Sequence, residues 1–250
     1  MKRTTTLLLS LLLLATTLSA QPKVIAHRGY WRAEGSAQNS IKSFVAAAEL
    51  GCWGSEFDVW LTADDQLILY HDDSLGGERV EKLNYTDLAD YRLSNGEPLP
   101  LLAEFLRVAQ QYPDIQLVFE LKGHHNHERE MRAVKLAVDM IEQMGLAHRT
   151  DYISFSHAAC KEFIRLAPQN KVFYLRGELT AGQLLDEGFA GADYHGGIYV
   201  GNPKFVDELH KRGLEANIWT INDPSDQRRA IALGVDYITT DYPELLVKEN

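Results

Sequence analysis

The residues that decide the fold lie between His27 and His71, and the second half of this stretch, residues 54–72, reads GSEFDVWLTADDQLILYHD. Glu56 and Asp58 stand two apart in a mostly apolar run typical of a strand, where residues i and i+2 face the same side. Two carboxylates on one buried face repel each other and are costly to desolvate. A hard divalent cation with oxygen ligands, Mg²⁺ or Ca²⁺, relieves that cost. The flanking histidines suggest acid–base chemistry on a substrate held at the metal.

Strand-like and helix-like runs alternate from residue 21 onward, with no linker between them. The predicted strands are Val24–His27, Glu56–Trp60, Leu67–Tyr70, Gln116–Leu121, Tyr152–Ser156, Lys171–Tyr174, Ala192–His195, Glu215–Thr220 and Tyr237–Thr240. The predicted helices are Ser40–Leu50 with Asn39 as its N-cap, Leu99–Gln111, Glu128–Met144, Ala158–Leu166, Thr180–Glu187, Pro203–Lys211 and Ser225–Leu233. This alternation favours a parallel sheet, and at this length a (β/α)₈ TIM-type barrel that forms one domain over residues 21–250.

One pair of strands breaks the regular repeat. Nine strand-like runs are one too many for the barrel, and only residues 61–66 separate Glu56–Trp60 from Leu67–Tyr70. That connection is too short for a helical crossover, so we expect a distorted barrel. The polar region Asp72–Pro98 predicts a small insertion after the His71 strand. The alternative fold is an open doubly wound sheet, although the chain lacks a glycine-rich phosphate loop after its first strand.

Several short motifs follow one another along the chain: His27-Arg28-Gly29, Asn39-Ser40, Glu56-Phe57-Asp58-Val59, His71-Asp72, Glu120-Leu121-Lys122, Trp219-Thr220-Ile221-Asn222 and the run Gly234–Pro243. In this order and spacing they resemble the glycerophosphodiester phosphodiesterase family, from about Val24 to Pro243. The resemblance implies a distorted barrel. It also implies metal-dependent hydrolysis of small glycerophosphodiesters to sn-glycerol 3-phosphate and an alcohol.

Ionisable residues collect where the predicted barrel strands end, which is the active face of such a barrel. Glu120 lies in an apolar strand, and a carboxylate is rarely buried there without a partner. We therefore expect Glu56, Asp58 and Glu120 to hold one divalent cation, Mg²⁺ or Ca²⁺. By the resemblance, His27 and His71 are the catalytic general base and general acid. Which histidine has which role stays open, as does attack by water or by the substrate's own 2-hydroxyl.

The formal charge of −10, without a basic run, excludes nucleic acid as a partner and makes any phosphate recognition local. Arg28 and Lys122 are expected to contact the phosphate, although both are equally ordinary salt-bridge partners for the acids. By the resemblance, Trp219 and Phe155 line the pocket against the carbon skeleton of the substrate. Gln38 stands where the family usually has a glutamate, and its uncharged amide leaves metal affinity and substrate preference open.

Residues 1–20 have the features of a secretory signal peptide. Lys2 and Arg3 precede an apolar core over Leu7–Ala15, and Leu18-Ser19-Ala20 forms a small-residue cleavage site. The apolar core is short for a transmembrane helix, and an uncleaved anchor is the alternative. We expect an exported protein with no stable membrane insertion after cleavage. The resemblance to bacterial enzymes points to the periplasm, with secretion as the other destination.

Alternatives remain at this stage for the cysteines and for the function. Cys52 and Cys160 either form one disulfide or stay buried as free thiols, as their apolar surroundings favour. The alternative functions are a related barrel phosphodiesterase for lysophospholipid or phosphoinositol substrates, a non-catalytic protein that binds glycerophosphodiesters, and a structural barrel without metal affinity. The headgroup and the oligomeric state are open.

Overall fold

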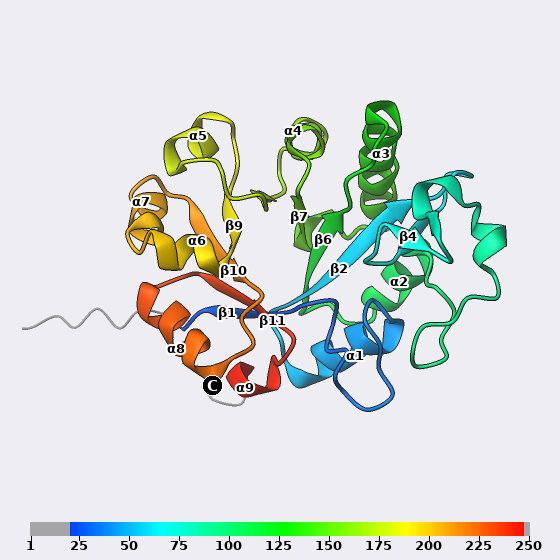
Figure 1. The fold of residues 1–250 in the computed structure, drawn as a ribbon, viewed down its shortest axis with the longest axis horizontal. Coiled ribbons are helices and arrows are strands. Elements are labelled where there is room, and N and C mark those ends of the chain that lie inside the picture. Colours follow the sequence, from blue (N-terminus) through cyan, green and yellow to red (C-terminus); the bar gives the residue numbers. More distant parts are fainter. Residues whose placement is uncertain (1–20, 248–250) are drawn as a thin grey trace, which may run out of the picture.

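Eight parallel strands close into a ring in the structure, a computed structural model that describes residues 21–247 (Figure 1). In ring order they are β1 (Lys23–Ala26), β2 (Gly54–Leu61), β6 (Gln116–Leu121), β7 (Thr150–Ser154), β8 (Val172–Tyr174), β9 (Gly191–His195), β10 (Glu215–Trp219) and β11 (Tyr237–Thr240). β1 pairs with both β2 and β11, which closes the ring. The predicted (β/α)₈ barrel is confirmed, and the open doubly wound sheet is wrong.

The ninth strand-like run lies outside the ring. β3 (Leu67–Leu69) turns back and pairs antiparallel with β2, so that Val59 stands opposite Leu69. The reverse turn between them is held by the Thr62 hydroxyl, which accepts a hydrogen bond from the Gln66 backbone N–H at 2.9 Å. An antiparallel return needs only a tight turn, which explains why the short connection breaks the barrel repeat.

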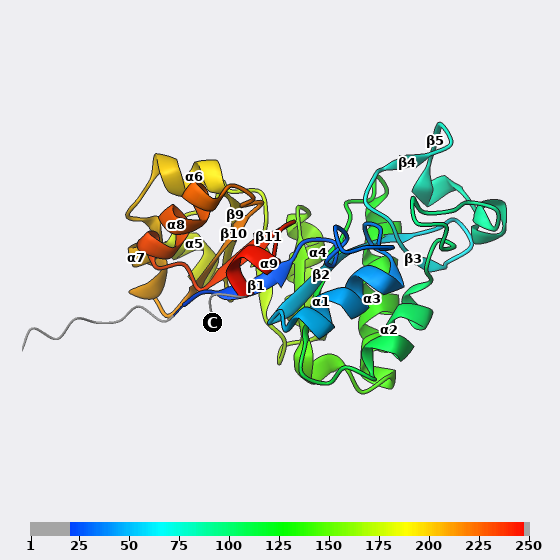
Figure 2. The same cartoon turned by 90° about the horizontal axis from the view of Figure 1, so that it is seen from below.

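Helices cover the outside of the ring (Figures 1 and 2). They are α1 (Ile41–Leu50), α2 (Leu102–Ala109), α3 (His127–Gln143), α4 (His157–Leu166), α5 (Ala181–Asp186), α6 (Gly196–Gly201), α7 (Phe205–His210), α8 (Pro224–Leu233) and α9 (Glu244–Val247). A short 3₁₀ helix, Ala147–Arg149, precedes β7. Within residues 21–247, no helix combines the length and the apolar character needed to cross a membrane.

The cap predicted for the first helix is wrong by one residue. Ser40, not Asn39, caps α1, because the Ser40 hydroxyl accepts a hydrogen bond from the Ser43 backbone N–H at 3.0 Å. Asn39 is used elsewhere: its side-chain amide donates to Asp58 Oδ2 at 2.8 Å and accepts from the Asp58 backbone N–H at 3.0 Å. Two residues with good capping side chains stand side by side, and a tertiary contact decides between them.

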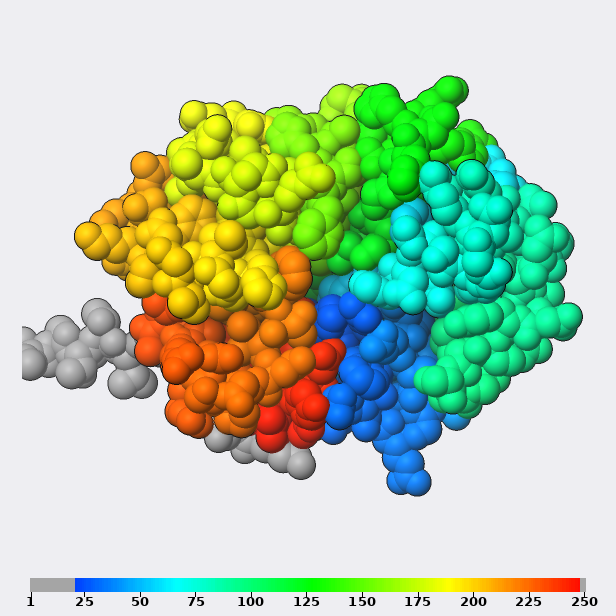
Figure 3. Space-filling model, viewed as in Figure 1, coloured from blue at the N-terminus to red at the C-terminus, as the bar shows by residue number. Residues whose placement is uncertain are grey.

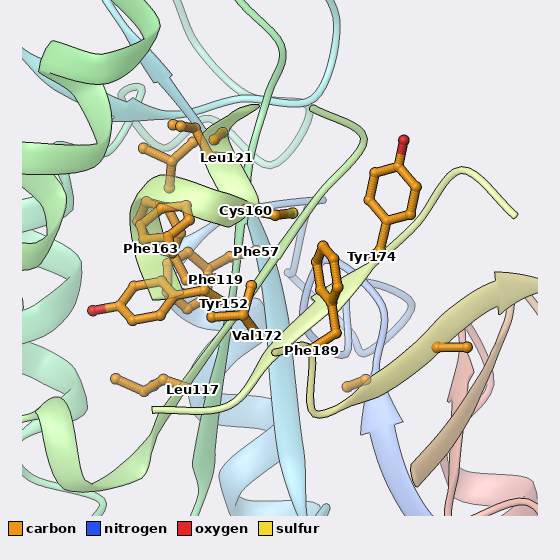
Figure 4. Packing of buried hydrophobic residues seen from close by; sticks show 14 of the residues in the cluster. Phe57, Leu117, Phe119, Leu121, Tyr152, Cys160, Phe163, Val172, Tyr174 and Phe189 are labelled. Carbon is orange, nitrogen blue, oxygen red and sulfur yellow. The ribbon is translucent and has the colours of Figure 1, made fainter. Parts of the chain in front are cut away.

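Side chains alternate in direction along each strand, so one set faces the outside of the ring and the other its interior. Phe57 in β2 and Phe119 in β6 point outward into the main core, where Phe119 meets Phe57, Tyr152 and the α4 residue Phe163 (Figure 4). The rings of Tyr152 and Phe163 stack with centroids 4.3 Å apart. Because side chains in a strand alternate in direction, the residues between these outward-facing ones, including Glu120, point into the ring.

The predicted insertion after β3 is present. It contains the hairpin β4 (Ser74–Leu75) and β5 (Glu78–Arg79), followed by the 3₁₀ helices Val80–Lys82 and Tyr85–Leu88. Figure 2 shows the hairpin projecting beyond the end of the barrel that carries β3. The insertion has a small core of its own, formed by Val80, Leu88 and Leu93 against Trp60 and Ile68.

The predicted signal peptide lies outside the described residues, and export of the chain stays a prediction.

Candidate active site

The three carboxylates predicted to bind a metal meet inside the ring. Glu56, Asp58 and Glu120 are all buried, and one oxygen atom of each lies within 4.8 Å of the others. Their meeting follows from the strand register, since Asp58 of β2 stands opposite Glu120 of β6 and Glu56 precedes Asp58 by two residues on the same face. Both strands end at the active face of the barrel, so the cluster lies where barrel enzymes place their chemistry.

Burial and mutual repulsion disfavour the ionised forms of two of these acids. Burial raises the pKa of Glu56 well above its usual value, and the charges of Asp58 and Glu120 raise it further. Burial and the charge of Asp58 likewise raise the pKa of Glu120 to about 7. Glu56 Oε1 is buried without a hydrogen-bond partner among the described residues. Closely spaced oxygen ligands that lack counter-charge fit a hard divalent cation such as Mg²⁺ or Ca²⁺.

Lys122 supplies part of the missing positive charge. Its ammonium nitrogen lies 2.8 Å from Glu120 Oε1 and 3.2 Å from Asp58 Oδ1. Burial alone would lower the pKa of Lys122, but the two carboxylates raise it above its usual value. Burial also opposes ionisation of Asp58, yet Lys122 and the other cations nearby outweigh it and lower the pKa of Asp58. Asp58 and Lys122 are therefore both ionised at neutral pH.

The turn at Arg28 and Gly29 brings a second cation to the site. Both residues have positive φ, 56° and 73°, and the turn directs the Arg28 backbone N–H to Glu56 Oε2 at 2.7 Å. A Cβ atom on Gly29 would lie 2.4 Å from Ser43 Oγ and 2.7 Å from the Ser43 carbonyl carbon, so the turn requires glycine. Arg28 Nη1 donates to Gln38 Oε1 at 2.8 Å. Gln38 thus binds the arginine and does not join the carboxylate cluster.

Both predicted catalytic histidines line one cavity of about 90 Å³ beside the carboxylates. His27 Nδ1 pairs with Asp241 Oδ1 at 2.8 Å, and His71 Nδ1 pairs with Asp72 Oδ1 at 2.7 Å. Each carboxylate orients a ring through Nδ1, which leaves Nε2 for the substrate. Burial lowers the pKa of His71 despite the opposing charge of Asp58. In the space-filling view the surface is hollowed where the segment after β1, in dark blue, meets green and orange segments (Figure 3).

Asp241 is a site residue that the sequence reading quoted within a motif but gave no role. Its carboxylate also accepts hydrogen bonds from Trp31 Nε1 at 2.9 Å and from Asn222 Nδ2 at 2.7 Å. Burial alone would raise the pKa of Asp241, but the hydrogen bonds from His27, Trp31 and Asn222 bring it far below its usual value. Asp241 is therefore an ionised anchor for His27.

The two aromatic residues expected near the substrate lie together at one side of the cavity. Trp219 lines it, and its indole Nε1 donates to the Asp193 carbonyl oxygen at 2.9 Å. Phe155 meets Trp219 edge to face, with ring centroids 5.6 Å apart, and stands at the rim with 38% of its surface exposed. The Asp193 side chain, which the sequence reading missed, is buried in the cavity wall, and burial followed by the charge of Glu120 raises its pKa well above its usual value.

Comparison with known proteins identifies the class to which this barrel and site belong. Residues 27–245 match the model of the glycerophosphoryl diester phosphodiesterase family, and the chain belongs to that family. A glycerophosphodiester phosphodiesterase of Caldanaerobacter subterraneus subsp. tengcongensis is 29% identical over 90% of this chain and 96% of the relative.

Solved structures of similar proteins share the fold over nearly the whole chain. A glycerophosphodiester phosphodiesterase from Parabacteroides distasonis is 49% identical, with a TM-score of 0.90 over 92% of this chain and 96% of that one. An Oleispira antarctica phosphodiesterase in complex with the product sn-glycerol-3-phosphate is 25% identical, with a TM-score of 0.77 over 92% of this chain and 98% of that one.

Proposed function

We propose that this chain hydrolyses glycerophosphodiesters to sn-glycerol 3-phosphate and an alcohol. The observation that carries the proposal is the pairing of two histidines, each oriented by a carboxylate, with three buried carboxylates in one cavity. A protein that only binds phosphodiesters needs no acid–base pair. The relative from Caldanaerobacter and the product complex of the Oleispira enzyme support the same reaction.

Glu56, Asp58 and Glu120 would hold the divalent cation. When bound, Mg²⁺ or Ca²⁺ supplies charge that polarises a non-bridging phosphate oxygen and offsets the charge developing in the transition state. Arg28 and Lys122 border the same cavity or its carboxylates and would bind the remaining phosphate oxygens. The guanidinium offers two parallel hydrogen bonds to the phosphate, and the ammonium offers a point charge.

His27 and His71 would divide the two proton transfers between them. One histidine takes the proton of the attacking oxygen as that oxygen bonds to phosphorus. The other gives a proton to the alcohol oxygen as the bond between that oxygen and phosphorus breaks. Attack by water gives the products directly, whereas attack by the substrate's 2-hydroxyl gives a cyclic phosphate that water then opens. Both routes use the same two side chains.

The alternative substrate, a lysophospholipid, would need an apolar surface near the site for its acyl chain. Among the described residues, the insertion exposes no large hydrophobic side chain. Phe155, which lies outside the insertion, is exposed beside Trp219. Lysophosphatidylcholine is therefore a necessary member of the substrate panel, and we expect it to react more slowly than glycerophosphocholine.

The reaction can be tested with purified residues 21–250 and a panel of glycerophosphodiesters. We expect release of glycerol 3-phosphate with Mg²⁺ or Ca²⁺, and loss of that release with a chelator. Release that a chelator leaves unchanged would contradict the metal. No release from folded protein with any diester or metal would contradict the proposed function and favour a binding protein.

The acid–base roles are tested by His71→Ala. We expect turnover to fall by at least about a hundredfold, because one of the two proton transfers loses its donor or acceptor. The fold and the thermal stabilisation by metal should persist, because the ligands are untouched. His125→Ala, which alters an exposed histidine outside the cavity, is the matched control and should keep full activity. Near-normal turnover of His71→Ala would remove His71 from the mechanism.

A further inference from the structure

A second cavity, of about 240 Å³, adjoins the catalytic cavity at His71. Its wall includes Trp31, Gln38, Tyr70, His71, Asp72 and Tyr91. His71 lines both cavities, and Gln38 of the second one holds Arg28 of the first through a hydrogen bond of 2.8 Å. A phosphodiester whose phosphorus lies beside His71 and Arg28 can therefore extend one substituent into the second cavity.

The lining of this second cavity is aromatic and acidic. Tyr70 and Tyr91 meet edge to face with ring centroids 5.9 Å apart, and Trp31 is fixed by its hydrogen bond to Asp241. The Asp72 carboxylate is 64% exposed beside them. Among residues 21–247, no lysine or arginine lines the cavity, although the Arg32 guanidinium stacks on the ring of Trp31, 4.8 Å from its centroid. Aromatic rings together with a carboxylate attract a cation, and aromatic side chains recognise substituted ammonium groups.

The two substituents of the diester then occupy different sides of the phosphorus. The side near Trp219 and Phe155 presents two aromatic rings in edge-to-face contact, and it suits the carbon skeleton of glycerol. The His71 side leads into the aromatic and acidic cavity. Since the two esters leave phosphorus in different directions, one substituent on each side accounts for both cavities.

We propose that the cavity lined by Trp31, Tyr70 and Tyr91 receives the leaving alcohol and selects alcohols that carry an ammonium group. The proposal rests on the proposed function and adds the class of headgroup. It also gives the insertion a role, since the insertion supplies Tyr91. Neutral polyols lack the charge that the rings and Asp72 attract, so we expect them to be poorer substrates.

The test compares two substrates of the same shape. One is sn-glycero-3-phosphocholine. The other is the 3,3-dimethylbutyl ester of sn-glycerol 3-phosphate, in which carbon replaces the quaternary nitrogen of choline. The wild-type ratio of kcat/KM, choline ester over isostere, is expected to be about fivefold or more, the scale of one cation–π contact. Tyr91→Leu removes one ring and should bring the ratio close to one. Tyr85→Leu, a half-buried insertion tyrosine outside this cavity, should leave it unchanged.

The outcomes separate this proposal from the reaction itself. Hydrolysis of both esters at a ratio close to one, or a ratio that Tyr91→Leu does not change, would overturn the cavity proposal and leave the proposed function standing. An equal fall of the ratio in Tyr91→Leu and Tyr85→Leu would show a general effect of the insertion and would also overturn it. Hydrolysis of neither ester would remove the proposed function, and the cavity proposal with it.

Discussion

Asp241 shows how a single residue can matter to the site without any local signal for its role. It follows the last strand of the ring and anchors His27, which follows the first. The periodicity of apolar residues cannot predict this contact, because the contact depends on the first and last strands becoming neighbours in the folded ring. The motif resemblance included both Asp241 and Asn222, whereas their hydrogen bond, and the one from Trp31, became apparent only in the folded chain.

Asp241→Asn is expected to lower kcat about a hundredfold, since an amide no longer provides the negative charge that holds and supports the His27 ring. The residue acts through His27, so a limb of the pH–rate profile should be displaced as well. Asp226→Asn, at an exposed site on α8, is the control. A variant with a reduced kcat and an unaltered pH profile would restrict Asp241 to a structural role.

Glu56 and Glu120 make the stability of the metal-free protein depend on pH in a defined direction. The pKa of Glu120 is raised from 4.5 to about 7 by burial and by Asp58. A carboxyl group whose pKa is raised on folding stabilises the folded state at pH below 4.5, and this stabilisation is lost as the pH rises through about 7. A divalent cation needs the ionised ligand, so it acts in the opposite sense.

Metal-induced thermal stabilisation should therefore increase between pH 5 and pH 8, which thermal unfolding with and without Mg²⁺ or Ca²⁺ would measure. Glu120→Gln should remove most of this stabilisation at the higher pH. Glu128→Gln, an exposed acid at the start of α3, is the matched control and should behave as wild type. A metal effect of equal size at both values of pH would contradict the cluster as the binding site.

At the scale of elements, strand-like runs in the sequence were enough to predict the nine strands of the large sheet. β6 and β11 have the predicted bounds, and the other seven predicted strands differ by one or two residues at their ends. The hairpin strands β4 and β5 were not predicted. α6 was not predicted because it runs from Gly196 to Gly201 and has no helical spacing of apolar residues. The antiparallel course of β3 was not predicted either, because a short connection shows that a crossover is absent but not which partner the strand takes.

The pairing of β9 with β10 depends on a glycine for reasons of space. A Cβ atom on Gly191 would lie 1.9 Å from the carbonyl oxygen of Glu215, its register partner. Gly191→Ala is therefore expected to destabilise the barrel by about 2–3 kcal/mol, which urea unfolding would measure. Gly182→Ala in α5 has room for a methyl group and should be neutral or slightly stabilising. Equal stability of the two variants would contradict the close strand approach.

For the molecule as a whole, the structure answers whether the two cysteines form a disulfide, which the sequence left open. Cys52 and Cys160 are both free and both buried, the first before β2 and the second within α4. Burial raises the pKa of Cys52 to about 12 and that of Cys160 above its usual value, so neither forms thiolate readily at neutral pH. The chain thus folds without a covalent crosslink between them.

Purified residues 21–250 should accordingly show two thiols that react with a thiol reagent only after denaturation. The native protein should stay unlabelled for much longer than the unfolded protein, because the thiols are buried and protonated. A count of thiols in native and denatured protein, prepared without reductant, would measure this. No reactive thiol after denaturation would show a disulfide, and rapid labelling of the native protein would contradict the burial.

The seam at which the ring closes has a further consequence for how the enzyme is made. β1 is the first strand of the chain to be synthesised and β11 the last, and their pairing completes the barrel. The contact between His27 and Asp241 lies across the same seam. A nascent chain that stops short of β11 therefore lacks both the closure of the ring and the carboxylate that orients His27. We therefore expect catalytic competence to arise only with the final strand, and truncated translation products to be inert rather than partly active.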